Sequence, residues 1–185
     1  MLLKEKDGFL YFDVSDGLEN YSQRNNEYID EITNKKIAGN MCNVTSYVMA
    51  GSYNGYVFPK GRFKQEEDNL LDFIRHDKDV LAYYEKTLPN YFKAWRNNEK
   101  DNYPPEQIHD VLCYGFNKWM KYEAAKFKPS AKISDIVKSI VVYNLATVMS
   151  GKFGNLGHIV VLVGLKAKKE IMDHLDDENI LDYIE

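Results

Sequence analysis

The strongest constraint on the fold is a change in the hydrophobic period of the sequence near residue 146. Before this point, apolar residues recur every three or four positions, which is typical of amphipathic helices. This spacing predicts helices over 42–51 and 66–84, a helix that follows Pro104-Pro105, and a fourth helix with Ser134 as its cap. Residues 15–41 are polar and predict a long irregular segment.

Strands are expected at both ends of the chain. Residues 8–14 are aromatic and β-branched, and the segments 146–149, 159–165 and 180–184 also have the character of strands. Because most helices precede most strands, the order indicates an α+β fold. We expect N-terminal helices that pack on a small antiparallel C-terminal sheet.

The composition is that of one folded domain over 1–185, which we expect to be a monomer, although the sequence leaves the oligomeric state open. The chain is 44% hydrophobic and 28% charged, and no linker divides it. The net charge of −4 argues against nucleic acid as a partner. No apolar run reaches the roughly 18 residues of a membrane span, so no membrane partner is expected. The first residues lack the layout of a signal peptide, so we expect synthesis in the cytoplasm.

Cys42 is the first candidate for chemistry, because it lies where the polar loop turns into the helix predicted over 42–51. A thiol reacts as its thiolate, which a helix N-terminus favours. Position alone leaves open that Cys42 is a small buried hydrophobic residue. Cys113, the other cysteine, lies in the middle of a predicted helix with no loop before it. Two cysteines cannot form a disulfide framework.

His158 is the second candidate. It follows Gly157 and precedes the apolar run IVVLVGL, so it is expected at the start of a strand, where its ring could face a cleft. The other histidines have weaker contexts: His76 lies in a charged helix, His109 in a first helical turn and His174 in an acidic run. A helix-N-terminal cysteine with a histidine far downstream is the order of papain-like enzymes, which bring the two residues together in space.

Three segments resemble one family in its own order. GNMCNVTSYVMA resembles the nucleophile segment of the double-glycine-leader-peptidase-like branch of the papain superfamily. GHIVVLVGL is similar to the histidine segment of that branch, and YSQRNN is similar to its Ser-Gln segment, which supplies a glutamine.

The resemblance implies a papain-like fold and a cysteine peptidase that needs no cofactor. Cys42 would be the nucleophile, and His158 would take its proton and later protonate the leaving amine. Gln23 would stabilise the oxyanion together with the backbone N–H of Cys42. Residues 24–41 would then be an insertion, because this family usually places the glutamine closer to the cysteine.

A third residue, Asp or Asn, orients the histidine in this family. Asp182 ranks first, because it lies within the segment predicted as a strand over 180–184. The alternatives are Asp173, Asp176, Asp177 and Asn179, or a residue beyond the end of this chain. Asp13 and Asp16 before Gly17 resemble a fragment of an acidic metal loop, but the full EF-hand pattern is missing, so no metal is expected.

The segments YSQRNN and CNVTS are also similar to phage and Gram-positive wall-hydrolase modules. We therefore expect hydrolysis of an amide bond in bacterial peptidoglycan, at the cell wall, after release from the cell or from a virion. Two alternatives stay open: a non-catalytic papain-like binding or virion structural module, and a protein-processing cysteine peptidase.

Overall fold

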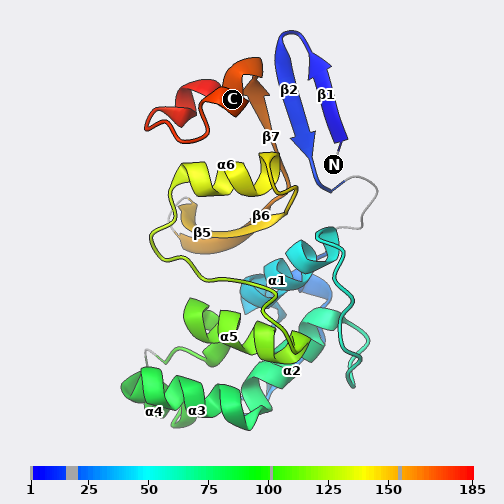
Figure 1. Cartoon of the computed structure of the whole chain (residues 1–185). Helices are drawn as coiled ribbons and strands as arrows, with labels where there is room; N and C mark the ends of the chain where they lie inside the picture. The colour runs from blue at the N-terminus through cyan, green and yellow to red at the C-terminus, as the bar shows by residue number, and fades with distance from the viewer. Residues whose placement is uncertain (1, 16–20, 101, 154–155) are drawn as a thin grey trace. The chain divides into compact units, whose positions relative to one another are not determined.

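The computed structural model describes residues 2–15, 21–100, 102–153 and 156–185, which divide into two units (Figure 1). The sheet unit comprises the described residues of Met1–Asn20 together with Met49–Tyr56 and Lys128–Glu185. The helical unit comprises Tyr21–Val48 and Val57–Phe127. The single domain expected over 1–185 stays a prediction.

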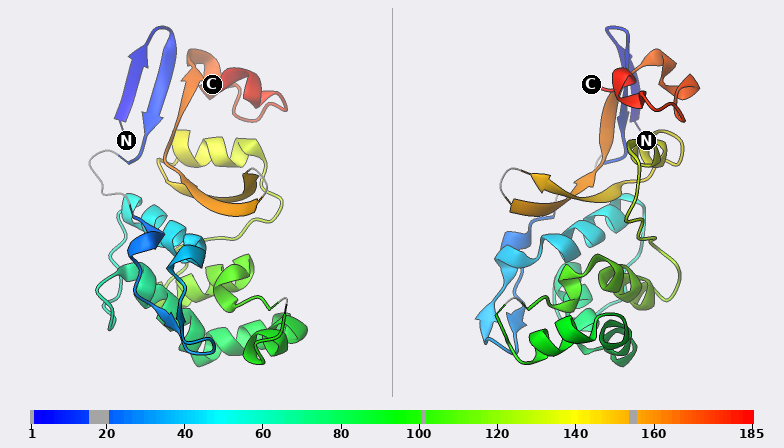
Figure 2. Two further views of the ribbon diagram at one scale, coloured as in Figure 1. Left: turned by 180° about the vertical axis from the view of Figure 1, so that it is seen from behind. Right: turned by 90° about the vertical axis from the view of Figure 1, so that its left-hand side faces the viewer.

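A three-stranded antiparallel sheet joins the two ends of the chain within the sheet unit. Its strands are β1 (Leu2–Lys6), β2 (Phe9–Asp13) and β7 (Gly164–Lys168), in the order β1-β2-β7 (Figure 2). Asp7 and Gly8 form the two-residue turn between β1 and β2, with positive φ angles of 52° and 85°. Two consecutive positive φ angles are typical of the tight turns whose twist suits a hairpin.

The sheet unit also contains a second hairpin and a helix. The hairpin consists of β5 (Thr147–Phe153) and β6 (Leu156–Leu162), and the helix α6 (Ile133–Val141) contacts β2, β5 and β7. Two 3-10 segments follow β7: η4 (Lys169–Asp173) and η5 (Ile180–Tyr183). The apolar face of α6 is buried against the three-stranded sheet in a core formed by Phe12, Val137, Ile140, Val141, Ala167, Ile171 and Ile180.

The helical unit packs several helices around one apolar centre. Its elements are the first half of α1 (Cys42–Tyr53), α2 (Glu66–His76), α3 (Lys78–Thr87), α4 (Pro89–Arg96), η3 (Pro105–Gln107) and α5 (His109–Met120). Its fully buried side chains include Val44, Val48, Leu70, Leu71, Ile74, Val80, Tyr84, Val111 and Leu112. The segment before α1 holds η1 (Gln23–Asn25), β3 (Ile29–Asp30), β4 (Lys35–Lys36) and η2 (Ala38–Asn40).

The α+β class is confirmed, since the described residues form six α-helices and small antiparallel sheets. The expected purely C-terminal sheet is wrong in one respect, because β1 and β2 from the N-terminus pair with β7. Within the described ranges, every helix is too short or too polar to cross a membrane.

Several predicted boundaries are wrong for local reasons. The helix expected over 66–84 is two helices, because the carboxylate of Asp77 caps α3 by accepting from the N–H groups of Asp79 and Val80. Asp182 lies in the 3-10 segment η5 rather than in a strand. Ser134 does not cap α6, which begins at Ile133, and the Asp135 carboxylate accepts the N–H of Lys132 instead.

Candidate active site and its buried ion-pair network

Cys42 is the first residue of α1, as the sequence predicts, and it is half-buried. The helix starts with a 3.0 Å hydrogen bond from the N–H of Thr45 to the carbonyl of Met41. The backbone N–H of Cys42 therefore belongs to the first turn, whose donors have no acceptor within the helix. Such a donor is available to an oxygen atom that approaches the thiol.

Asn43 holds the thiol of Cys42 in place. The Cys42 thiol donates to Oδ1 of Asn43 at 3.1 Å, and Nδ2 of Asn43 donates to the backbone carbonyl of Glu106 at 2.8 Å. Asn43 is buried, so these bonds fix its amide firmly. Reasoning from the sequence missed this residue, although its position directly after Cys42 was the available signal.

Gln23 lies against the loop that leads to Cys42. Its Nε2 donates to the carbonyl of Gly39 at 3.2 Å, three residues before the cysteine. Nearby, the buried amide of Asn26 donates to Sδ of Met41 and Oγ1 of Thr45, both at 3.3 Å. The structure thus brings Gln23 and Cys42 into one region of the helical unit, despite the 18 residues between them.

His158 and Asp182 both belong to the sheet unit, whereas Cys42 and Gln23 belong to the helical unit. His158 is exposed on β6 opposite Gly151 of β5. The carboxylate of Asp182 is exposed and accepts from Nδ2 of Asn179 at 3.3 Å. The role of Asp182 as the residue that orients His158 stays a prediction.

Two of the alternatives to Asp182, Asp176 and Asp177, have other partners. Asp176 forms an ion pair with Lys138, and Asp177 contacts Nδ1 of His174 at 2.6 Å. The carboxylate of Asp13 accepts from the backbone and side chain of Ser15, and these bonds hold its pKa below the usual range. Asp16 and Gly17, from the possible metal loop, lie outside the described residues.

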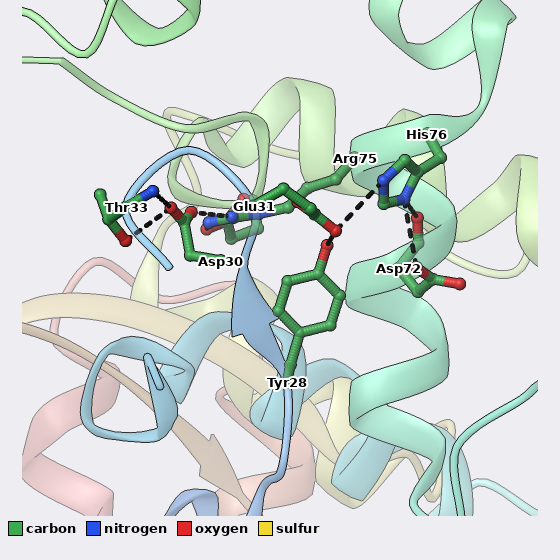
Figure 3. A network of polar contacts seen from close by, with 8 residues as sticks. Tyr28, Asp30, Glu31, Thr33, Asp72, Arg75 and His76 are labelled. Atoms are coloured by element: carbon green, nitrogen blue, oxygen red, sulfur yellow. Dashed lines mark hydrogen bonds and ion pairs between the residues drawn. The ribbon is translucent and has the colours of Figure 1, made fainter. Parts of the chain in front are cut away.

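The helical unit contains a buried ion-pair network around Arg75 (Figure 3). The guanidinium of Arg75 on α2 contacts the carboxylates of Asp30 and Glu106, and all three residues are buried. Glu106 accepts two bonds, at 2.5 Å from Nη2 and 3.1 Å from Nε, while Asp30 also accepts from Thr33. Arg75 therefore ties β3 and η3 to α2, and η3 in turn holds Asn43.

The positive charge of Arg75 lies between the two carboxylates, and these charges affect the pKa values of the network. Burial by itself would lower the pKa of Arg75, but Glu106 and Asp30 raise it overall. Burial would likewise raise the pKa of Asp30, but the hydrogen bonds from Thr33 and Arg75 lower it overall. Arg75 and Asp30 therefore stay charged, because the attraction and the hydrogen bonds between the partners offset the cost of desolvation.

Beside this network, donor atoms of Glu31, Asp72 and His76 lie within 4.8 Å of one another, so these residues could hold a metal ion (Figure 3). Each already has protein partners. Arg62 contacts Asp72 at 2.6 Å, Tyr28 donates to Glu31 at 2.6 Å, and Nε2 of His76 lies 3.2 Å from Glu31. These contacts satisfy the cluster without an ion, and the expected absence of a metal stays a prediction.

Cys113 differs from Cys42 in its surroundings. It is buried in the middle of α5, and burial raises the pKa of its thiol. A thiol of this kind is inert at neutral pH, because little of it is thiolate.

Comparison with known proteins gave no match: no family model, no curated protein and no solved structure corresponds to this chain.

Proposed function

We propose that this chain is a papain-like cysteine peptidase or amidase that hydrolyses an amide bond in bacterial peptidoglycan, with Cys42 as its nucleophile. The observation that carries the proposal is the placement of Cys42 at the first position of α1, with the Gln23 segment bonded to the loop before it. The Cys42 thiol is half-buried at the start of a helix, in contrast to the buried Cys113 in the middle of α5.

The reaction proceeds through a thioester. His158 takes the proton of the Cys42 thiol, and the sulfur attacks the carbonyl carbon of the substrate amide. The bond between carbon and nitrogen then breaks, and His158 gives its proton to the leaving amine. A water molecule attacks the thioester while His158 takes one of its protons. The bond between carbon and sulfur then breaks, the carboxylic acid leaves, and His158 returns the proton to the sulfur.

The oxyanion of each tetrahedral intermediate needs hydrogen-bond donors. The backbone N–H of Cys42 is one, and the side-chain amide of Gln23 is the other. That amide has two hydrogens, and its bond to the Gly39 carbonyl uses one of them. A single donor of this kind contributes about 2.7–4 kcal/mol to acyl transfer.

The choice of peptidoglycan rests on the resemblance of YSQRNN and CNVTS to modules of wall hydrolases. On this proposal the enzyme acts at the bacterial cell wall. A protein-processing peptidase would use the same residues on a peptide substrate, so the substrate needs its own test.

The test is digestion of purified Gram-positive peptidoglycan, with the products identified by mass spectrometry. We expect fragments from the wild type and from Cys113→Ala, and none from Cys42→Ala. The masses of the fragments identify the bond. Equal cleavage by Cys42→Ala would contradict the role of Cys42 as the nucleophile. If the wild type cleaves no peptidoglycan, on walls of several cross-bridge types, the proposal that peptidoglycan is the substrate would be contradicted.

A further inference from the structure

The outward face of the β1-β2-β7 sheet concentrates positive charge on an acidic protein. In the strand register, Lys6 pairs with Phe9 and Phe9 with Lys168, while Lys4 pairs with Tyr11 and Tyr11 with Lys166. These six residues point to one side of the sheet, and we call them the lysine face. The opposite side is the core that α6 covers. Since the whole chain has a net charge of −4, this cluster is a local feature.

Two of the four lysines of the lysine face, Lys4 and Lys6, have no ion-pair or cation–π partner in the described part of the protein. Among the described residues, no carboxylate forms an ion pair with Lys4, Lys6 or Lys168, whereas Lys166 pairs with Glu185. Lys4, Lys6 and Lys168 are also exposed. Lys4, Lys6 and Tyr11 line an open hollow of about 500 Å³, together with Asp13, Ser15 and Gly164. The ammonium group of Lys168 lies 5.6 Å from the ring centroid of Tyr183, so those of Lys4 and Lys6 are the two that are available to an anionic partner.

The two aromatic rings of the lysine face hold a lysine rather than offer a flat platform. Nζ of Lys166 lies 4.0 Å from the ring centroid of Phe9 and 5.9 Å from that of Tyr11, which are cation–π contacts. Single-stranded nucleic acids bind through bases stacked on open aromatic faces. The covered rings therefore favour an anionic chain without bases.

We propose that the lysine face binds a linear phosphodiester polymer of the bacterial wall, of the poly(glycerol phosphate) type. Lysines on one strand stand roughly 7 Å apart, and those on β1 and β7 stand roughly 10 Å apart across the sheet. A flexible chain with one charge per repeat can meet several of them at once. This inference rests on the proposed function, because such polymers accompany the peptidoglycan substrate, and binding would keep the enzyme at the wall.

Binding is measured by fluorescence anisotropy with a labelled poly(glycerol phosphate) oligomer at low salt. The variant Lys4→Gln/Lys6→Gln removes two unpaired charges from the lysine face. The matched control Lys35→Gln/Lys36→Gln removes two adjacent exposed charges from β4 in the helical unit. We expect the first variant to bind at least tenfold more weakly than the wild type, and the control to bind within twofold of it. Circular dichroism checks that both variants fold.

Three results would overturn the inference: no binding by the wild type, equal weakening in both variants, or tighter binding of single-stranded DNA of the same charge. The measurement needs no catalysis, so a failure to cleave peptidoglycan would leave its result interpretable. Conversely, loss of binding with unchanged cleavage of soluble peptidoglycan fragments would separate the lysine face from the active site.

Discussion

At the scale of single residues, Arg75 is the buried cation that two buried carboxylates of the helical unit share. We predict that Arg75→Met lowers the free energy of unfolding by about 3–5 kcal/mol, because it leaves the buried carboxylates of Asp30 and Glu106 without a cation. Urea denaturation measures the change. Arg62→Met is the control, since Arg62 forms an exposed ion pair with Asp72 that is worth about 0–1 kcal/mol. Equal losses in the two variants would contradict the role of the buried network.

Glu67 provides a prediction on pH. Burial raises the pKa of this carboxyl to about 6, and its Oε2 is buried without a hydrogen-bond partner. The folded state therefore binds the proton more tightly than the unfolded state, so the free energy of unfolding falls as pH rises from about 4.5 to about 6. The fall amounts to roughly 2 kcal/mol.

Glu67→Gln removes this fall and is expected to be more stable than the wild type at pH 7, with little difference at pH 4. Thermal or urea unfolding across this range measures the effect. Glu66→Gln, one position earlier on α2, is the matched control. If Glu66→Gln flattens the dependence of the free energy of unfolding on pH and Glu67→Gln does not, Glu67 is not the cause of the fall.

At the scale of elements, the contact between α2 and α5 depends on a residue without a side chain. A Cβ atom at position 115 would lie 2.8 Å from Cγ1 of Ile74, which is fully buried. Helix propensity alone favours Ala over Gly by about 1 kcal/mol, whereas overpacking a core costs about 1–3 kcal/mol. We predict a net loss of about 1 kcal/mol for Gly115→Ala.

A double-mutant cycle checks this explanation. Ile74→Ala removes the atom that Gly115→Ala would meet, so the double variant should lose less stability than the sum of the single variants. Additive losses would mean that the two helices do not meet at this point.

The sequence predicted long, strongly periodic elements well and short ones poorly. The helix at Cys42 and the helix after Pro104-Pro105 are confirmed, because each has a clear start signal and a continuous apolar face. The split at Asp77 was missed, since a polar capping residue does not interrupt the helical spacing of its apolar neighbours. The short helix α4 was missed because it offers only eight residues of pattern.

In the candidate site, too, only the features that depend on local sequence could be predicted. Cys42 could be placed at a helix start from local signals. The contacts of Asn43 with Glu106, and of Arg75 with Asp30, join segments far apart in the sequence, and no local pattern encodes them. The expected strand at 180–184 failed because Ile180 turns into the core against α6, and only Ile184 forms a bridge with Ala167.

At the scale of the whole molecule, the proposed mechanism requires one residue from each of the two units. A general base must come within hydrogen-bond reach of the thiol that it activates, and Cys42 and His158 belong to different units. We therefore predict that His158→Cys, in a Cys113→Ala background, becomes cross-linked to Cys42 by a short bifunctional thiol reagent. Peptide mapping detects the link. Ser150→Cys, on the neighbouring strand β5, serves as the comparison site. Cross-linking at Ser150→Cys alone would argue against His158 as the base.

The central claim is that Cys42 forms a covalent bond to the substrate. The most direct measurement mixes the protein with soluble peptidoglycan fragments, stops the reaction with acid, and records the intact mass followed by peptide mapping. The account predicts an acyl adduct on the peptide that contains Cys42, in the wild type and in Cys113→Ala but not in Cys42→Ala. Cleavage of the substrate with no adduct, or an adduct on Cys113, would contradict it.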